Sequence, residues 1–217
     1  MHRFAYAEQD VLPLLMAAAR LASMRRNHVT VVAKEGGVPE ITSLWFDCGK
    51  KAAEACGVKL RTMDVDFAAY QMIAHPDEFD VMAVPNCFGD ILADLGGVLM
   101  GSRGITFGAS YSPTGCGVYQ TNHGAAHDLA KKNKANPAGQ LFSLAMLLRE
   151  SFGLCEEARA IVDAIRQSWL EGWRTADILS KGCRLVGTAE MGDVVAANIV
   201  NSAGRKKRFN ESAAPAC

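Results

Sequence analysis

Two aspartates four residues apart have the residue type and the spacing of a metal site. Asp90 and Asp94 lie in the otherwise apolar, periodic stretch 86–100, which predicts a helix. A separation of four residues places both carboxylates on one face of that helix, where they repel each other. A hard divalent cation, Mg²⁺ or Mn²⁺, would relieve the repulsion because it prefers carboxylate oxygens. The alternative is that one aspartate caps the helix near Asn86 and the other faces water.

Other chemically useful side chains follow predicted strands. Lys34 comes directly after the β-branched run 29–33, and Asp64 and Asp66 lie at the end of the strand predicted over 58–65. Ligands of parallel α/β sheets gather at the carboxyl ends of the strands. The lysine and the two acids could therefore converge there. Either aspartate could instead cap the following helix.

A polar loop rich in small residues is a third candidate. Residues 123–128 read His-Gly-Ala-Ala-His-Asp. Small side chains let the backbone approach a ligand closely, and the carboxylate of Asp128 could accept hydrogen bonds from ribose hydroxyls. The alternative is an ordinary turn in which the aspartate is a cap.

The elements that must position these residues alternate between helix and strand. A helix is predicted over 8–25, and later ones over 41–56, 68–73, 138–152, 156–172 and 188–201. Strands are predicted over 29–33, 58–65 and 79–84; 101–117 is glycine-rich strand and loop, and 122–137 is a polar loop. This order is that of an α/β protein.

Composition excludes several classes of protein. The chain has 217 residues, 49% hydrophobic and 21% charged, with a formal net charge of zero. Such a chain is globular, and it has no overall field that would draw it to nucleic acid or to a membrane surface. We expect the basic run 205–208 to be a solvated tail rather than a localisation or nucleic-acid patch. The apolar run 11–19 is too short to cross a membrane. We expect neither partner.

Cysteine usage points to a reducing compartment. The seven cysteines are scattered, and no two form a Cys-x-x-Cys pair. This pattern argues against a metal knuckle or a redox dithiol, and it fits cysteines that act as small apolar residues. We therefore expect a cytoplasmic protein.

The motifs together resemble the isocitrate/isopropylmalate dehydrogenase family, the β-decarboxylating dehydrogenases. Residues 85–94, Pro-Asn-Cys-Phe-Gly-Asp-Ile-Leu-Ala-Asp, resemble that family's most recognisable stretch. Residues 123–128, followed by 135–137, resemble its adenosine-binding loop. The separations of 32, 24 and 4 residues that lead from Lys34 to Asp66, Asp90 and Asp94 also match those of the family's catalytic lysine and metal aspartates.

The resemblance implies a role for each matching residue. Lys34 would handle the proton of the substrate hydroxyl, provided that its pKa is lowered. Asp66 would contribute to the metal site of the neighbouring subunit, as a metal ligand and catalytic residue. Asp90 and Asp94 would bind the metal of their own subunit. The expected cofactor contacts are His123, Gly124, Asp128 and Asn136.

The implied reaction is an oxidative decarboxylation that depends on NAD and on Mg²⁺ or Mn²⁺. The substrate would be a small 2-hydroxy acid with a carboxylate on C3. The acid at Asp128 resembles the version that prefers NAD, because a carboxylate accepts ribose hydroxyls and repels a 2′-phosphate. A homodimer is expected because Lys34 and Asp66 would serve the partner's site.

The implied fold is an incomplete isopropylmalate dehydrogenase-like α/β fold, with a mixed sheet flanked by helices. Residues 1–98 would be the metal-binding and dimer-forming half, 99–201 the nucleotide-binding half, and 202–217 a flexible tail. The resemblance begins near the helix before Lys34, so we expect an N-terminally truncated member. The absent part would supply the substrate-binding arginines and a catalytic tyrosine.

Three smaller departures surround the expected substrate and nicotinamide. Gly36 stands where the family has asparagine, Gln120 where it has glutamate, and His127 where it has proline. A separate chain or a rearranged dimer could supply what is missing. The alternatives are a non-catalytic or regulatory relative that binds nucleotide or metal, and a metal-assisted decarboxylation without hydride transfer.

Overall fold

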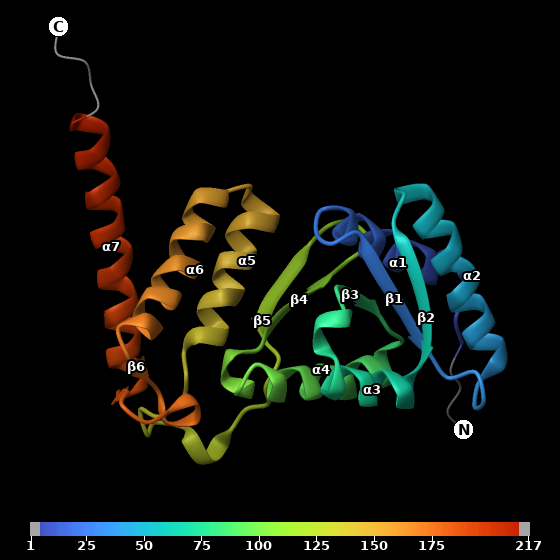
Figure 1. Ribbon diagram of the computed structural model, residues 1–217, viewed down its shortest axis with the longest axis horizontal. Helices are drawn as coiled ribbons and strands as arrows, with labels where there is room; N and C mark the ends of the chain where they lie inside the picture. Colours follow the sequence, from blue (N-terminus) through green and yellow to red (C-terminus); the bar gives the residue numbers. More distant parts are fainter. Residues whose placement is uncertain (1–4, 213–217) are drawn as a thin grey trace, which may run out of the picture. The chain divides into compact units, whose positions relative to one another are not determined.

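The computed structural model describes residues 5–212 of the chain. The chain divides into two compact units, the first ending at Leu99 and the second beginning at Met100. Both units contain helices and strands (Figure 1).

The first unit is built around a parallel three-stranded sheet in the order β2-β1-β3. The β-branched residues of β1 favour a buried central strand, and only the first residue of this strand is not buried. The strands are β1 (His28–Ala33), β2 (Lys59–Asp64) and β3 (Val81–Ala83). The helices are α1 (Glu8–Ser23), α2 (Pro39–Cys56), α3 (Val65–Ala74), the short η1 (Pro76–Glu78) and α4 (Asn86–Leu99).

Helices cover both faces of this sheet. Val29 and Val31 of β1 pack in one apolar cluster with residues of α1 and α2. Val32 packs on the opposite face with Ala68 of α3 and Leu92 of α4. This alternation is the two-residue period of a strand. The carboxyl ends of the strands are thereby left at one edge, where α2 and α3 begin.

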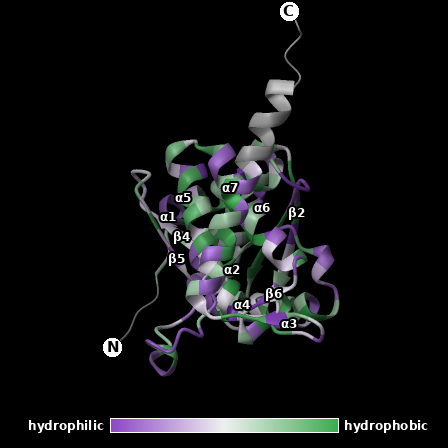
Figure 2. Cartoon of the chain, turned by 90° about the vertical axis from the view of Figure 1, so that its left-hand side faces the viewer, coloured by the Kyte–Doolittle hydropathy of each residue, from purple (hydrophilic) through white to green (hydrophobic). Residues whose placement is uncertain are grey.

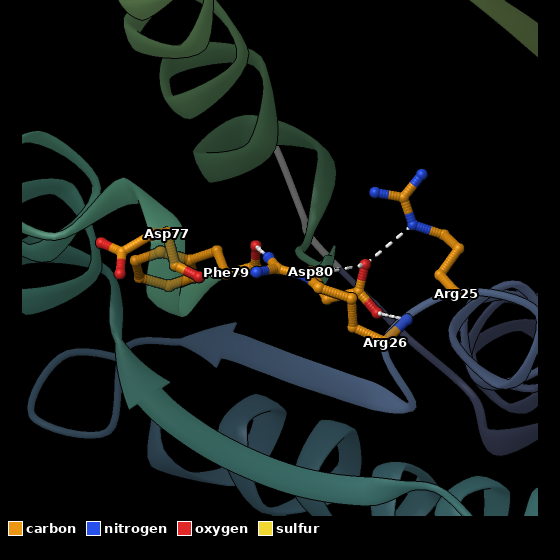
Figure 3. A network of polar contacts seen from close by, with 5 residues as sticks. All are labelled: Arg25, Arg26, Asp77, Phe79 and Asp80. Atoms are coloured by element: carbon orange, nitrogen blue, oxygen red, sulfur yellow. Dashed lines mark hydrogen bonds and ion pairs between the residues drawn. The ribbon is translucent and has the colours of Figure 1, made fainter.

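A buried carboxylate ties two turns together near the amino ends of β1 and β3. The side chain of Asp80 is only 1% exposed. Its Oδ1 accepts a hydrogen bond from Nε of Arg25 at 2.8 Å, and its Oδ2 accepts one from the backbone N–H of Arg26 at 2.9 Å (Figure 3). The guanidinium of Arg26 also donates to the carbonyls of Asp77 and Phe79. This network fixes the turn that precedes β1 against the turn that precedes β3.

The second unit combines short strand pairs with three long helices. Its apolar core includes Ile161 and Ile165 of α6 and Met191 of α7. The colouring along α5 and α6 is mixed, as expected for helices buried along one face (Figure 2). The strands are β4 (Phe107–Tyr111), β5 (Gly117–Thr121), β6 (Trp173–Arg174) and β7 (Arg184–Leu185). The helices are η2 (Arg103–Ile105), η3 (His127–Leu129), α5 (Ala138–Phe152), α6 (Cys155–Leu170), η4 (Ala176–Ile178) and α7 (Thr188–Ser212).

Parallel and antiparallel pairing both occur, in separate sheets rather than in one mixed sheet. β1, β2 and β3 are connected through helices, whereas residues 112–116 join β4 directly to β5, a connection that permits antiparallel pairing. The sequence does not predict β5, β6 or β7 as strands. α7 continues to Ser212, beyond the predicted end at 201. Of the tail expected over 202–217, residues 213–217 lie outside the described residues.

Candidate active site

Polar side chains meet at the carboxyl edge of the parallel sheet. Ala33 of β1 is in register with Asp64 of β2, so that Lys34 and Asp64 lie next to each other where the two strands end. Asp66 follows in the first turn of α3. The parallel register therefore brings together a lysine and two aspartates that lie some thirty residues apart in the sequence.

The ammonium group of Lys34 is held between two carboxylates. Its Nζ donates to Oδ1 of Asp66 at 2.8 Å and to Oδ2 of Asp64 at 3.0 Å. The other oxygen of Asp64 accepts a hydrogen bond from the backbone N–H of Glu35 at 3.0 Å. Asp64 therefore fixes both the side chain of the lysine and the backbone directly after it.

These contacts favour the charged forms of all three groups. Hydrogen bonds to Asp66 and then to Asp64 raise the pKa of Lys34 above its ordinary value. The backbone N–H of Glu35 and then Lys34 lower the pKa of Asp64, and Lys34 lowers the pKa of Asp66. A proton-accepting role requires a lowered lysine pKa. The structure shows the opposite direction, because two carboxylates stabilise the ammonium form.

We expect Asp66→Asn to lower the pKa of Lys34, because Asp66 makes the largest contribution to raising it. The pKa should stay above its ordinary value, since Asp64 remains. NMR titration of ¹³C-methylated lysines measures the change, with Lys34→Arg assigning the signal. Glu8→Gln is the matched control, because Glu8 raises the pKa of Lys51 in the same way. An unchanged Lys34 titration in Asp66→Asn would contradict the ion pair.

The two helical aspartates do not join this cluster. Asp90 and Asp94 lie on α4 and both are exposed, with the four-residue spacing that puts them on one face. No group of three His, Cys, Asp or Glu residues within the described part of the chain could hold a metal ion. The structure thus brings Asp66 to Lys34 but not to Asp90 and Asp94. Within one chain the predicted metal ligands form two separate sets.

The four predicted cofactor residues lie in or beside one loop of the second unit. His123 approaches the carbonyl of Gly124 with its Nδ1 at 2.9 Å. A Cβ atom added at Gly124 would meet nothing within 4 Å, so the backbone there is open to a ligand. Asp128 lies in η3 and is exposed. These three residues leave a backbone and a carboxylate accessible.

Asn136 differs because its side chain is already used within the chain. The residue is 8% exposed. Its Oδ1 accepts a hydrogen bond from the backbone N–H of Ala138 at 2.9 Å, which satisfies a free N–H group in the first turn of α5. Its Nδ2 donates to Oδ2 of Asp177 at 3.1 Å. Asp177 is the functional candidate that sequence reasoning missed. It lies 41 residues from Asn136, and no local spacing connects the two.

The sequence of the chain matches a known family over most of its length. Residues 3–195 fit the profile of isocitrate/isopropylmalate dehydrogenase. The chain belongs to the isocitrate/isopropylmalate dehydrogenase family. The resemblance inferred from residues 85–94 and 123–137 is thereby confirmed.

Curated relatives support the same assignment. The chain is 41% identical to 3-isopropylmalate dehydrogenase of Acinetobacter baylyi over 194 residues, which cover 88% of this chain and 54% of that protein. It is 40% identical to 3-isopropylmalate dehydrogenase of Desulfitobacterium hafniense over 196 residues, covering 90% and 55%. The chain therefore spans about half the length of the curated relatives that it matches.

Solved structures show the same α/β fold. The isocitrate dehydrogenase from Methylococcus capsulatus matches with a TM-score of 0.84 at 30% identity, over 91% of this chain and 58% of that chain. The TT0538 protein from Thermus thermophilus matches with a TM-score of 0.84 at 25% identity, over 92% and 40%. Among the described residues, no helix has the length and apolar character needed to cross a membrane.

Proposed function

We propose that this chain takes part in the NAD- and divalent-metal-dependent oxidative decarboxylation of a 2-hydroxy acid that carries a carboxylate on C3. The observation that carries the proposal is the Lys34–Asp66 ion pair, which lies at the carboxyl edge of the sheet in a member of a dehydrogenase family. Because the chain spans about half of its relatives, the reaction is proposed for an assembly. We propose that a second copy of this chain, or a separate chain, takes part in that assembly.

The donor groups on α4 fit a divalent metal. Mg²⁺ commonly keeps several waters and binds one or two carboxylates together with its substrate. Asp90 and Asp94 are exposed neighbours on one helix face, and they would hold such an ion. Asp66 of a second copy would complete the ligand set. When bound, the metal supplies Lewis-acid polarisation of the substrate hydroxyl and carboxylate.

An exposed apolar surface on α3 and α4 supports a homodimer. Both helices are rich in apolar residues, yet Ala68, Leu92 and Gly97 are their only buried ones. The residues that remain exposed include Phe67 (49%), Tyr70 (66%), Ile73 (53%), Ile91 (61%) and Val98 (67%). Contiguous exposed apolar residues mark interaction sites. Contact through these helices would cover this surface and place α3 of one copy, which carries Asp66, near α4 of the other.

Lys34 would handle the substrate proton. Only the neutral amine can accept the proton of the C2 hydroxyl as the carbonyl forms, so this role requires the carboxylate of Asp66 to leave the ammonium group first. Asp64 fixes the lysine through the hydrogen bond at 3.0 Å and would continue to do so if Asp66 turned toward a metal. Asp64 thus keeps the lysine in place while Asp66 changes its partner.

The loop 122–137, termed here the nucleotide loop, would bind the adenosine part of NAD. Gly124 lets the backbone approach the cofactor, and His123 lies beside it. The exposed carboxylate of Asp128 would accept the ribose hydroxyls and repel a 2′-phosphate, which favours NAD over NADP. Asn136 would contribute through its backbone, since its side chain is bonded to Asp177 and Ala138.

The metal assignment predicts a loss of Mn²⁺ stabilisation in Asp90→Asn. Mn²⁺ and NAD⁺ should each raise the melting temperature of the unmodified chain, because both bind the native state. The substitution removes one of two carboxylates on α4, so the Mn²⁺-dependent shift should vanish while the NAD⁺-dependent shift stays. Differential scanning calorimetry measures both shifts. Asp47→Asn, which removes an exposed acid from α2, is the control. An equal Mn²⁺ shift in Asp90→Asn would refute the assignment.

A non-catalytic, ligand-binding relative is the second candidate, and the raised pKa of Lys34 favours it. A lysine held as ammonium by two carboxylates is a poor proton acceptor. NADH formation separates the two candidates, with 3-isopropylmalate and isocitrate as probes in the presence of Mn²⁺ and NAD⁺. Melting shifts with Mn²⁺ and NAD⁺ but no absorbance at 340 nm would support the non-catalytic candidate.

A further inference from the structure

The carboxylate of Asp177 collects hydrogen bonds from three separate segments of the second unit. Its Oδ2 accepts from Oγ of Ser102, just before η2, and from Nδ2 of Asn136 at 3.1 Å. Its Oδ1 accepts from Oγ1 of Thr175 at 2.6 Å. Thr175 is fully buried and Asn136 nearly so. Burial raises the pKa of Asp177, but the bonds from Ser102, Thr175 and Asn136 outweigh it, so that the pKa is lowered.

The nucleotide loop needs such external contacts because its backbone is strained. Ala126, Lys131 and Asn133 have left-handed φ angles of 45°, 62° and 52°. These are three of the four non-glycine residues with positive φ in the described part of the chain. A left-handed conformation is costly for a residue with a Cβ atom, and it persists only where surrounding structure enforces it. Contacts at the end of the loop must therefore hold its shape.

The space around Asn136 leaves little room for an alternative arrangement. A Cβ atom at Gly104 would lie 2.9 Å from Cβ of Asn136 and 2.9 Å from Oδ2 of Asp177. Gly104 also donates its backbone N–H to Oγ of Ser102 at 2.9 Å. The asparagine, the carboxylate and η2 are thus packed in direct contact. Asn136 cannot move without disturbing the groups that bond Asp177.

We propose that Asp177 is a positioning residue that holds Asn136, and through it the nucleotide loop, in the conformation that binds the cofactor. The proposal rests on the proposed function of the loop. Asn136 links Asp177 to the first turn of α5, since its Oδ1 bonds the N–H of Ala138. With the carboxylate removed, the amide of Asn136 loses a charged partner, and the end of the loop loses its attachment to η2 and η4.

The test compares Asp177→Asn with Glu171→Gln in the full chain. Glu171 is a matched control because it is a carboxylate of the same unit that accepts hydrogen bonds from Gln167 and Asn198, on α6 and α7. Calorimetric titration with NAD⁺ and with AMP measures affinity. We expect Asp177→Asn to weaken NAD⁺ binding about tenfold, the effect of losing one hydrogen bond to a charged group. Glu171→Gln should bind as tightly as the unmodified chain.

A second readout does not depend on the cofactor. Lys131, Lys132 and Lys134 are exposed trypsin sites in the nucleotide loop. Mass spectrometry of a limited digest should show faster cleavage at these lysines in Asp177→Asn and an unchanged rate in Glu171→Gln. Ser102→Ala removes one donor but keeps the carboxylate. Ser102→Ala should weaken NAD⁺ binding and speed cleavage at the loop lysines by smaller factors than Asp177→Asn. This second variant keeps the proposal testable if Asp177→Asn does not fold.

The outcomes separate the two proposals. Equal NAD⁺ affinity in Asp177→Asn and the unmodified chain would overturn the positioning role, as would an equal loss in Glu171→Gln. If even the unmodified chain binds neither NAD⁺ nor AMP, the proposed function fails. The positioning role is then decided by the digest, where faster loop cleavage in Asp177→Asn supports it and an unchanged rate overturns it.

Discussion

Gly139→Ala is expected to lower the free energy of unfolding of the second unit by about 2–3 kcal/mol. A Cβ atom at Gly139 would lie 2.7 Å from the carbonyl oxygen of Thr106 and 2.9 Å from that of Gly104. Both neighbours are backbone atoms, which cannot rotate away as a side chain would. The first turn of α5 would have to move off η2 and β4, and Asn136, three residues earlier, would move with it.

Hydrogen exchange followed by mass spectrometry at increasing urea concentration measures this effect in peptides from β4 and α5. Gly192→Ala is the matched control, because Gly192 is also helical and has nothing within 4 Å of an added Cβ. That variant should be neutral or slightly more stable, since alanine favours helix over glycine by up to about 1 kcal/mol. Equal stability of the two variants would show that α5 does not pack as closely as described.

Asp80→Asn is expected to lower the free energy of unfolding of the first unit by about 2 kcal/mol at pH 7. The carboxylate is 1% exposed and bonds the side chain of Arg25 and the backbone of Arg26. The asparagine side chain has the same shape as aspartate, but it lacks the negative charge and has one acceptor oxygen instead of two. The two arginine side chains are about half exposed, so water compensates part of the loss and holds the cost below that of a fully buried ion pair.

The same contact predicts a pH dependence. Burial raises the pKa of Asp80, but the bonds from Arg25 and Arg26 outweigh it and leave the pKa lowered. Because the pKa of Asp80 is lower in the folded chain than in the unfolded chain, where it is about 3.9, the carboxylate stabilises the fold at pH values above the unfolded pKa. This stabilisation is lost as the pH falls through the pKa of Asp80 in the folded chain. The stability difference between wild type and Asp80→Asn should therefore shrink as urea unfolding is repeated from pH 7 toward pH 3.

Asp47→Asn is the control for a surface ion pair. Asp47 and Lys50 are one helical turn apart, and both side chains are 64% exposed. Such pairs contribute roughly 0–1 kcal/mol, so this variant should stay close to the unmodified chain at every pH. A wild-type advantage over Asp80→Asn that stays constant down to pH 3 would mean that Asp80 does not bond the arginines as a charged group.

Much of the fold follows from local sequence signals. The β-branched run of β1 and the glycine that ends α2 place those elements correctly, because each signal acts within a few residues. Gly57 has a left-handed φ of 65°, as a helix-ending glycine should. β5 was not predictable in this way. Its residues Gly117–Thr121 become a strand through pairing with β4, whose register no single segment specifies.

The candidate site likewise contains residues that the sequence identifies and contacts that only the tertiary structure establishes. The sequence named Lys34, Asp66, Asp90 and Asp94, and the structure brings the first two into contact at 2.8 Å. Their metal and catalytic roles remain predictions. The raised pKa of the lysine depends on Asp66 and then on Asp64, and the position of Asp64 follows from the register of β1 and β2. Asp177 was out of reach because two of its three partners, Ser102 and Asn136, lie 75 and 41 residues away in the sequence.

The division at Leu99 has a consequence for biosynthesis. Each unit is one uninterrupted stretch of sequence, so the first needs no residue of the second to complete its sheet. On the ribosome, α1 to α4 can fold while the second unit is still being translated, as domains generally do. The apolar side chains of α3 and α4 then become exposed early, before the second unit is complete. For the proposed homodimer, this order allows two nascent chains on the same message to pair through these helices during translation.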